Sequence, residues 1–249
     1  MDISLIIGKK NSQGMPGKNV KKIIGRPAAE YAFIAAKYAN SDLIFTSSDS
    51  DEIGEIGSEY GSIFLKRPDE LATPEALTED ALVYAYNQIS DYLGSNAKNI
   101  NTISLLFCNN PAIDVNLLKT AKTKLKSEPE TDSYFSVAKY DMFSPTRARK
   151  LSSDGIIENF VPLENFDDVS SIRSSQGSVY FCDLSIQVMK PRCFENMDEG
   201  NLPFKWQGKI SKAIETDFGF DIDTSWQFVV IEHWLKEKGF TETKIPWEK

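Results

Sequence analysis

The most constraining feature of the sequence is a glycine- and lysine-rich loop that comes directly after a short apolar run. Residues 3–7 predict a buried strand, and the loop 8–19 follows at once. Three glycines in this loop let the backbone approach a ligand closely, and consecutive N–H groups can bind an anion. Ligands of parallel α/β sheets bind at the carboxyl ends of strands. The pattern predicts a phosphate-binding loop, although its glycine spacing matches neither the Walker loop nor the dinucleotide fingerprint. A purely structural turn is the alternative.

The rest of the chain alternates strand-like apolar runs with amphipathic stretches. Further strands are expected at 43–46, 63–65, 103–107, 178–182 and 209–214, and helices at 28–38, 51–60, 78–93, 115–126 and 226–238. This alternation predicts an α/β fold with a mainly parallel sheet and helices on both faces. The rhythm breaks between residues 141 and 175, which favours an inserted arm within a single domain of residues 1–249 over a second core.

Charge and composition exclude several classes of protein. A net charge of −8 argues against a nucleic-acid or membrane-surface binder. Residues 3–29 are the exception, because they contain six lysines and arginines and no acidic residue, as expected for a local anion site. The apolar runs are far shorter than a membrane span, and no leader-like segment opens the sequence. Three scattered cysteines show no metal-ligand spacing, so we expect a reduced, cytoplasmic protein.

Two aspartates near the carboxyl end form a candidate metal site. Asp221 and Asp223 are two positions apart, so in an extended segment both side chains point to the same face. Two carboxylates on one face are typical hard-oxygen ligands for Mg²⁺. Helix capping is the alternative, since Asp223 or Thr224 precedes an expected helix.

Several motifs together resemble one known family. The loop resembles the signature of CMP-sialic acid synthetases (acylneuraminate cytidylyltransferases), which commonly reads A-R-x-x-S-K-G-x-x-x-K-N. Five further segments match family motifs in the same order. These are residues 45–53 (V-S-T-D-x-x-x-I), 66–72 (R-P-x-x-L-A), 105–111 (L-L-Q-P-T-S-P), 177–180 (N-G-A-I-Y) and 220–224 (x-D-I-D-T).

The resemblance implies a Rossmann-like fold with a dimerisation arm at 141–175, hence a homodimer. It implies transfer of CMP from CTP to the anomeric hydroxyl of a sialic-acid-like nonulosonic acid, with release of pyrophosphate and Mg²⁺ as cofactor. The residues that it places in the reaction are Lys18, Lys9 and Arg173. Nucleotide-binding residues are Gly8, Lys9, Lys10, Asn11, Ser12, Gly14, Lys18, Asn19, Arg67, Ala76 and Thr78. Sugar-binding residues are Phe107, Asn109, Arg147, Gln176 and Tyr180, and Asp221 and Asp223 hold the metal.

Two departures from the family keep other functions open. Lys9 stands where the family has arginine, and lysine cannot bind phosphate in the bidentate way that arginine can. Phe107 stands where the family has glutamine. The acceptor could therefore be another acidic sugar, such as an eight-carbon ulosonic, legionaminic or pseudaminic acid. A nucleotide-binding homologue with weak or no activity is a further alternative. So is a glycosyltransferase that uses its D-x-D pair for a metal, although such a pair normally follows an internal strand.

Overall fold

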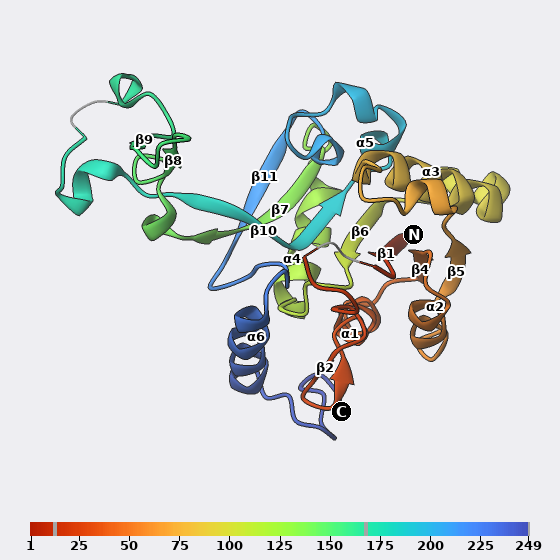
Figure 1. Cartoon of the computed structure of the whole chain (residues 1–249). Helices are drawn as coiled ribbons and strands as arrows, with labels where there is room; N and C mark the ends of the chain where they lie inside the picture. The colour runs from red at the N-terminus through yellow and green to blue at the C-terminus, as the bar shows by residue number, and fades with distance from the viewer. Residues whose placement is uncertain (12–13, 167–168, 249) are drawn as a thin grey trace.

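The computed structural model describes residues 1–11, 14–166 and 169–248, except for the side chain of Arg173. A seven-stranded sheet forms the centre of the molecule, in the order β11-β7-β10-β6-β1-β4-β5 (Figure 1). Six strands run in one direction. They are β1 (Asp2–Gly8), β4 (Leu43–Ser48), β5 (Ile63–Lys66), β6 (Thr102–Phe107), β7 (Ser133–Lys139) and β11 (Ser211–Thr216). Only β10 (Tyr180–Met189) is antiparallel to its neighbours β6 and β7. The predicted mainly parallel, Rossmann-like sheet is confirmed.

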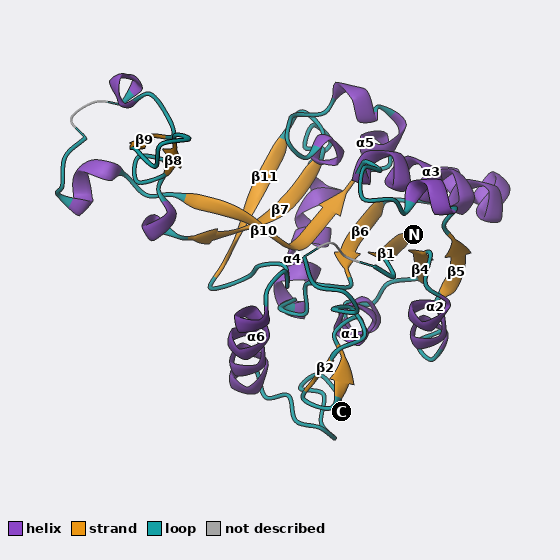
Figure 2. Cartoon of the chain, viewed as in Figure 1, coloured by secondary structure: helices purple, strands orange, loops and turns teal. Residues whose placement is uncertain are grey.

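Helices cover both faces of this sheet (Figure 2). Apolar residues of α1 (Glu30–Tyr38), α2 (Asp51–Ser58) and α4 (Val115–Ser127) form one core with one face of the strands. On the other face, α3 (Thr78–Leu93) and α5 (Arg192–Glu195) form a second core. A third cluster joins α1 to α6 (Ser225–Glu237) and to the hairpin of β2 (Lys22–Ile23) and β3 (Arg26–Pro27). Each face of the sheet is therefore buried, as the apolar runs require.

Side-chain hydrogen bonds set the first residues of two helices, α2 and α6. The Ser50 side chain accepts a hydrogen bond from the Ile53 N–H and begins α2. Thr224 begins α6 through a capping box with Gln227, so Thr224 rather than Asp223 caps this helix. The Asp223 carboxylate therefore does not cap the helix, and it can bind groups outside the helix.

Two parts of the sheet differ from the sequence-based expectation. Strand β7 was not predicted, and β10 extends to Met189 instead of ending at Cys182. Both contain buried polar residues that interrupt an apolar pattern. Ser133 and Ser136 of β7 are fully buried and donate hydrogen bonds to Gln207 O and to the Asp183 carboxylate. These buried serines are satisfied by hydrogen bonds to distant residues. The strand therefore lacks the continuous apolar run from which a buried strand is usually recognised.

The segment between β7 and β10 leaves the body of the molecule (Figure 1). It carries a small hairpin of β8 (Arg149–Leu151) and β9 (Ile157–Asn159), and its apolar side chains are largely exposed. Its position agrees with the break in rhythm at residues 141–175, while its role in dimerisation stays a prediction. Within the described residues, no helix is long and apolar enough to cross a membrane.

We predict that the buried amine of Lys122 stabilises the contact between α4 and α1. Lys122 is 3% exposed, and its Nζ donates to the carbonyls of Ala39 at 3.0 Å and Asn40 at 3.3 Å, just past the end of α1. Lys122→Met should lower the free energy of unfolding by roughly 1–3 kcal/mol, because these carbonyls lose a charged donor. Exposed Lys124→Met on the same helix is the control. Equal urea midpoints for both variants would contradict the assignment.

Candidate active site

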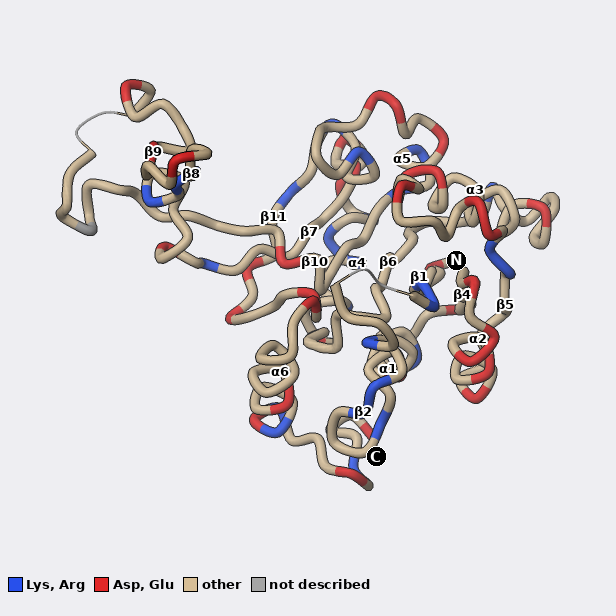
Figure 3. Tube along the Cα trace, viewed as in Figure 1, with Lys and Arg blue, Asp and Glu red and all other residues tan. Residues whose placement is uncertain are grey.

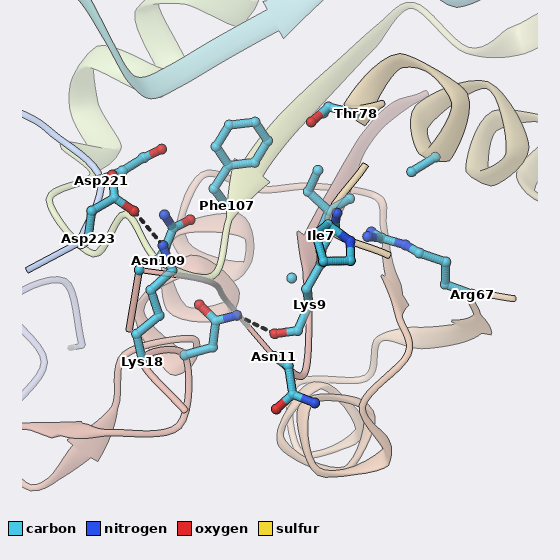
Figure 4. Close-up of a pocket in the computed structure, with 15 residues that line it drawn as sticks. Ile7, Lys9, Asn11, Lys18, Arg67, Thr78, Phe107, Asn109, Asp221 and Asp223 are labelled. Atoms are coloured by element: carbon cyan, nitrogen blue, oxygen red, sulfur yellow. Dashed lines mark hydrogen bonds and ion pairs between the residues drawn. The ribbon is translucent and has the colours of Figure 1, made fainter. Parts of the chain in front are cut away.

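A cavity of about 420 Å³ opens at the carboxyl ends of β1 and β6. Twelve of the predicted site residues line it (Figure 4). They are Gly8, Lys9, Asn11, Gly14, Lys18, Asn19, Arg67, Thr78, Phe107, Asn109, Asp221 and Asp223. The cavity also includes Ile7, Pro74 and Ala81, which the motifs did not indicate. Ala81 lies three positions after Thr78 on α3, so helical spacing from a predicted residue would have found it.

The structure does not bring every predicted residue to this cavity. Lys10 lies between two lining residues and Ala76 lies two positions from Pro74 and from Thr78, but neither residue lines the cavity itself. Arg147, Gln176 and Tyr180 belong to the protruding segment or its junction with β10, where Arg147 Nε donates to Gln176 Oε1 at 2.6 Å. Their assignment to the sugar stays a prediction. Ser12 lies outside the described residues, and so does the side chain of Arg173.

The loop after β1 is fixed at both of its ends. The backbone N–H of Lys10 donates to Asp49 Oδ1 at 2.8 Å, which joins the loop to the end of β4. Asn19 Nδ2 donates to the Lys9 carbonyl at 2.8 Å and closes the loop on itself. Figure 3 shows lysines and arginines gathered along the chain from this loop to α1, in an otherwise acidic protein. The loop therefore presents positive charge from a restrained backbone.

Lys18 lies beside the two aspartates at one corner of the cavity. Its Nζ lies 2.7 Å from Asp223 Oδ1, and only 8% of the residue is exposed (Figure 4). Asp221 Oδ1 accepts a hydrogen bond of 3.2 Å from Asn110 Nδ2. Burial and the nearby charge of Asp223 raise the pKa of Asp221 to about 7, against the opposing effects of Lys18 and Asn110. The ammonium of Lys18 thus neutralises only part of the negative charge at this corner.

The aspartate pair suits a metal that a substrate helps to hold. No group of three or more His, Cys, Asp or Glu side chains within residues 1–11, 14–166 and 169–248 could bind a metal alone. Mg²⁺ commonly binds one or two carboxylates together with substrate phosphates. The effect of Asp223 on the pKa of Asp221 indicates that the carboxylates are close enough to repel each other. Asp221 and Asp223 could therefore supply two oxygen ligands to Mg²⁺ at a site that a substrate completes.

The opposite side of the cavity contains Arg67 and Lys9. Arg67 is 2% exposed and donates from Nη2 to the Ser47 carbonyl at 2.9 Å. Its Nε and the Oδ1 of Asn19 are buried polar atoms without a partner among the described residues. Lys9 Nζ donates to the Thr73 carbonyl at 2.8 Å, and burial followed by the charge of Arg67 lowers its pKa. Lys9 therefore also holds the segment that leads to Pro74 and Thr78.

A sequence profile of the cytidylyltransferase family matches residues 3–154, more than half of the chain and all of the loop. The chain belongs to the cytidylyltransferase family. This match confirms the family that the motifs predicted.

Curated relatives carry related names. The chain is 32% identical over 91 residues, 36% of its length, to an N-acylneuraminate cytidylyltransferase of Escherichia coli. It is 26% identical over 78% of its length to a pseudaminic acid cytidylyltransferase and hydrolase of Helicobacter pylori. A CMP-N,N'-diacetyllegionaminic acid synthase of Legionella pneumophila is 24% identical over 88% of the chain. The matches span 22% and 36% of the first two relatives, and 92% of the third.

Solved structures of cytidylyltransferases have the same fold. CMP:2-keto-3-deoxy-manno-octonic acid synthetase complexed with CTP superposes with a TM-score of 0.65 at 12% identity, over 95% of this chain and 99% of that one. The 4-diphosphocytidyl-2C-methyl-D-erythritol synthase of Anaerococcus prevotii has a TM-score of 0.60 at 14% identity, over 94% and 96%. At these identities the likeness establishes the fold.

The aspartate pair should make metal-free stability depend on pH. The pKa of Asp221 is raised from 3.8 to about 7, so the folded protein holds this proton more tightly than the unfolded chain. Its contribution to stability is therefore lost as pH rises from about 4 through 7. In EDTA, Asp221→Asn should gain in Tm relative to wild type between pH 5 and pH 8. Exposed Asp217→Asn is the control. A wild-type-to-variant Tm difference that is constant over this range would contradict the assignment.

Proposed function

We propose that the protein transfers CMP from CTP to the anomeric hydroxyl of a sialic-acid-like nonulosonic acid and releases pyrophosphate. The observation that carries this proposal is the meeting of Lys18, Asp221 and Asp223 beside the glycine-rich loop, within a cytidylyltransferase chain. The names of the E. coli, H. pylori and L. pneumophila relatives support an acidic nine-carbon acceptor. Three free thiols, Cys108, Cys182 and Cys193, fit a reducing compartment, and we place the reaction in the cytoplasm.

Charge neutralisation explains why these residues lie together. A nucleoside triphosphate and a sugar carboxylate bring several negative charges into one cavity. Phosphoryl-type transfers depend mainly on positioning and on stabilising charge on the phosphates. The ammonium groups of Lys18 and Lys9 and the N–H groups of the loop supply positive charge or donors. Bound Mg²⁺ would neutralise further charge on the phosphates from its place at Asp221 and Asp223.

The same side chains would orient the reactants. The loop N–H groups hold the triphosphate, while Lys18 lies at the corner where the sugar hydroxyl would attack the α-phosphorus. Arg67 and Asn19 also line the cavity, and their guanidinium and amide groups are of the kinds that a pyrimidine with both donors and acceptors requires. Lys9 Nζ donates to the Thr73 carbonyl and so joins the loop to the segment before Pro74. The only histidine of the sequence, His233, lies on α6 and does not line the cavity.

One lining residue favours a second candidate acceptor. Phe107 lies between the aspartates and Thr78, and it exposes an aromatic face where a sugar could enter (Figure 4). An aromatic surface suits deoxygenated or acylated carbons better than free hydroxyl groups. The second candidate is therefore a cytidylyltransferase for a legionaminic or pseudaminic acid, whose names appear among the relatives.

Removing the ammonium of Lys18 should stop the reaction without unfolding the protein. We expect Lys18→Ala to lower kcat/KM for CTP-dependent pyrophosphate release more than tenfold, a loss above ~1.4 kcal/mol. The Tm should change little, because the partner Asp223 has a side chain that is 62% exposed. Exposed Lys22→Ala is the control and should retain full activity. A Lys18→Ala variant that keeps more than a tenth of the wild-type kcat/KM would contradict the proposed role of Lys18.

We also propose that the protein is a homodimer joined through the protruding segment. Apolar side chains there are exposed to an extent that monomers seldom show. They include Met142, Leu151, Ile156, Ile157, Phe160 and Ile172, which are 61–71% exposed. A two-fold dimer would bury them on a second copy.

Light scattering tests this arrangement. Wild type should be dimeric at micromolar concentration, and Phe160→Glu should shift the mass toward the monomer. The control Leu202→Glu replaces a residue on the body that is more exposed than Phe160, and it should leave the mass unchanged. A wild-type monomer with full activity would refute the dimer.

A further inference from the structure

Asn110 is a buried residue that does not line the cavity but reaches one of its carboxylates. It is 1% exposed and follows β6, beyond Phe107 and Asn109. Its Nδ2 donates to the Asp183 carbonyl at 2.8 Å and to Asp221 Oδ1 at 3.2 Å. The side chain therefore joins the irregular part of β10 directly to a candidate metal ligand.

The carbonyl that orients Asn110 is itself held firmly. Asp183 is 5% exposed, and its carboxylate accepts from the Ser136 hydroxyl, from the N–H and hydroxyl of Ser185, and from the Thr216 hydroxyl. A Cβ on Gly219 would lie 2.7 Å from Asp183 Cγ, so the chain leading to Asp221 passes against this cluster. A fixed acceptor for one amide hydrogen leaves the other hydrogen aimed at Asp221.

Backbone contacts alone do not set the direction of the Asp221 carboxylate. The Ile222 N–H donates to the Asn109 carbonyl at 2.8 Å and fixes the register of this segment. Side-chain rotation of Asp221 remains free unless a donor restrains it. Asn110 supplies such a donor from the buried side, in addition to the side chain of Asn109, although the Oδ1 of Asn110 is buried without a partner among the described residues. A residue needed only for packing could be apolar and avoid this unpaired acceptor.

We propose that Asn110 is a positioning residue that holds the Asp221 carboxylate beside Asp223, in the orientation in which both bind one divalent cation. The proposal rests on the metal use described under the proposed function. It assigns Asn110 no contact with either substrate, so the binding of nucleotide should be independent of this side chain.

Asn110→Leu tests this role, because leucine has a similar volume and lacks the donor. We expect the dissociation constant for Mn²⁺, measured by calorimetry both without nucleotide and with CTP present, to rise about tenfold, as for other residues that orient metal ligands. The Mg²⁺ concentration for half-maximal velocity should rise by a similar factor, while KM for CTP at saturating Mg²⁺ stays within about twofold. Ser104→Ala is the matched control, since Ser104 is fully buried on β6 with an unpaired hydroxyl. Asn110→Ser replaces the leucine variant if circular dichroism shows that the latter is unfolded.

A double-mutant cycle separates positioning from general damage. If Asn110 acts through Asp221, adding Asn110→Leu to Asp221→Asn should weaken Mn²⁺ binding no further than Asp221→Asn alone. Independent, multiplying effects would overturn the proposal, as would an Asn110→Leu affinity equal to that of Ser104→Ala. If wild type binds Mn²⁺ and Asp221→Asn does not weaken it, or if wild type binds no Mn²⁺ even with CTP present, the proposed metal site fails and the role of Asn110 fails with it.

Discussion

The ion pair between Lys18 and Asp223 connects residues that are 205 positions apart, and the candidate site depends on it. It joins the loop after the first strand to the segment after the last one, across the carboxyl end of the sheet. The neighbouring carboxylates of Asp221 and Asp223 repel each other, so one ammonium leaves the corner short of positive charge. The divalent cation that we propose at this corner would offset that imbalance.

The sheet makes this meeting possible because its central strands are parallel. Strands β1, β4 and β6 all end at the same edge, so the loop after β1, Asp49 after β4 and Asn109 after β6 lie together. The single antiparallel strand, β10, passes between β6 and β7 and carries Asp183 to the underside of the site. A buried polar cluster around Asp183 is therefore connected to the Asp221 carboxylate through Asn110.

Local patterns in the sequence were sufficient for the parts of the site that are continuous in the chain. The glycine-rich loop and the Asp221–Asp223 pair were each recognised from residue type and spacing, and the structure brings both to one cavity. The loss of α/β rhythm coincides with the segment between β7 and β10. Strand β7 was missed because Ser133 and Ser136 replace apolar residues and find their partners in distant segments. Asn110 could not be recognised for a related reason, since its partners lie 73 and 111 positions away. Such roles depend on the packed fold.

The most direct test of the account is the release of pyrophosphate by the purified protein, with the product identified by mass spectrometry. The reaction should be run with CTP, UTP, ATP or GTP, each with Mg²⁺ and with N-acetylneuraminic, legionaminic, pseudaminic or an eight-carbon ulosonic acid. We predict that pyrophosphate forms only with CTP and a nine-carbon acid, and that the product is the CMP-sugar. Tight CTP binding without pyrophosphate release for any of these acids would contradict the account and leave a nucleotide-binding protein.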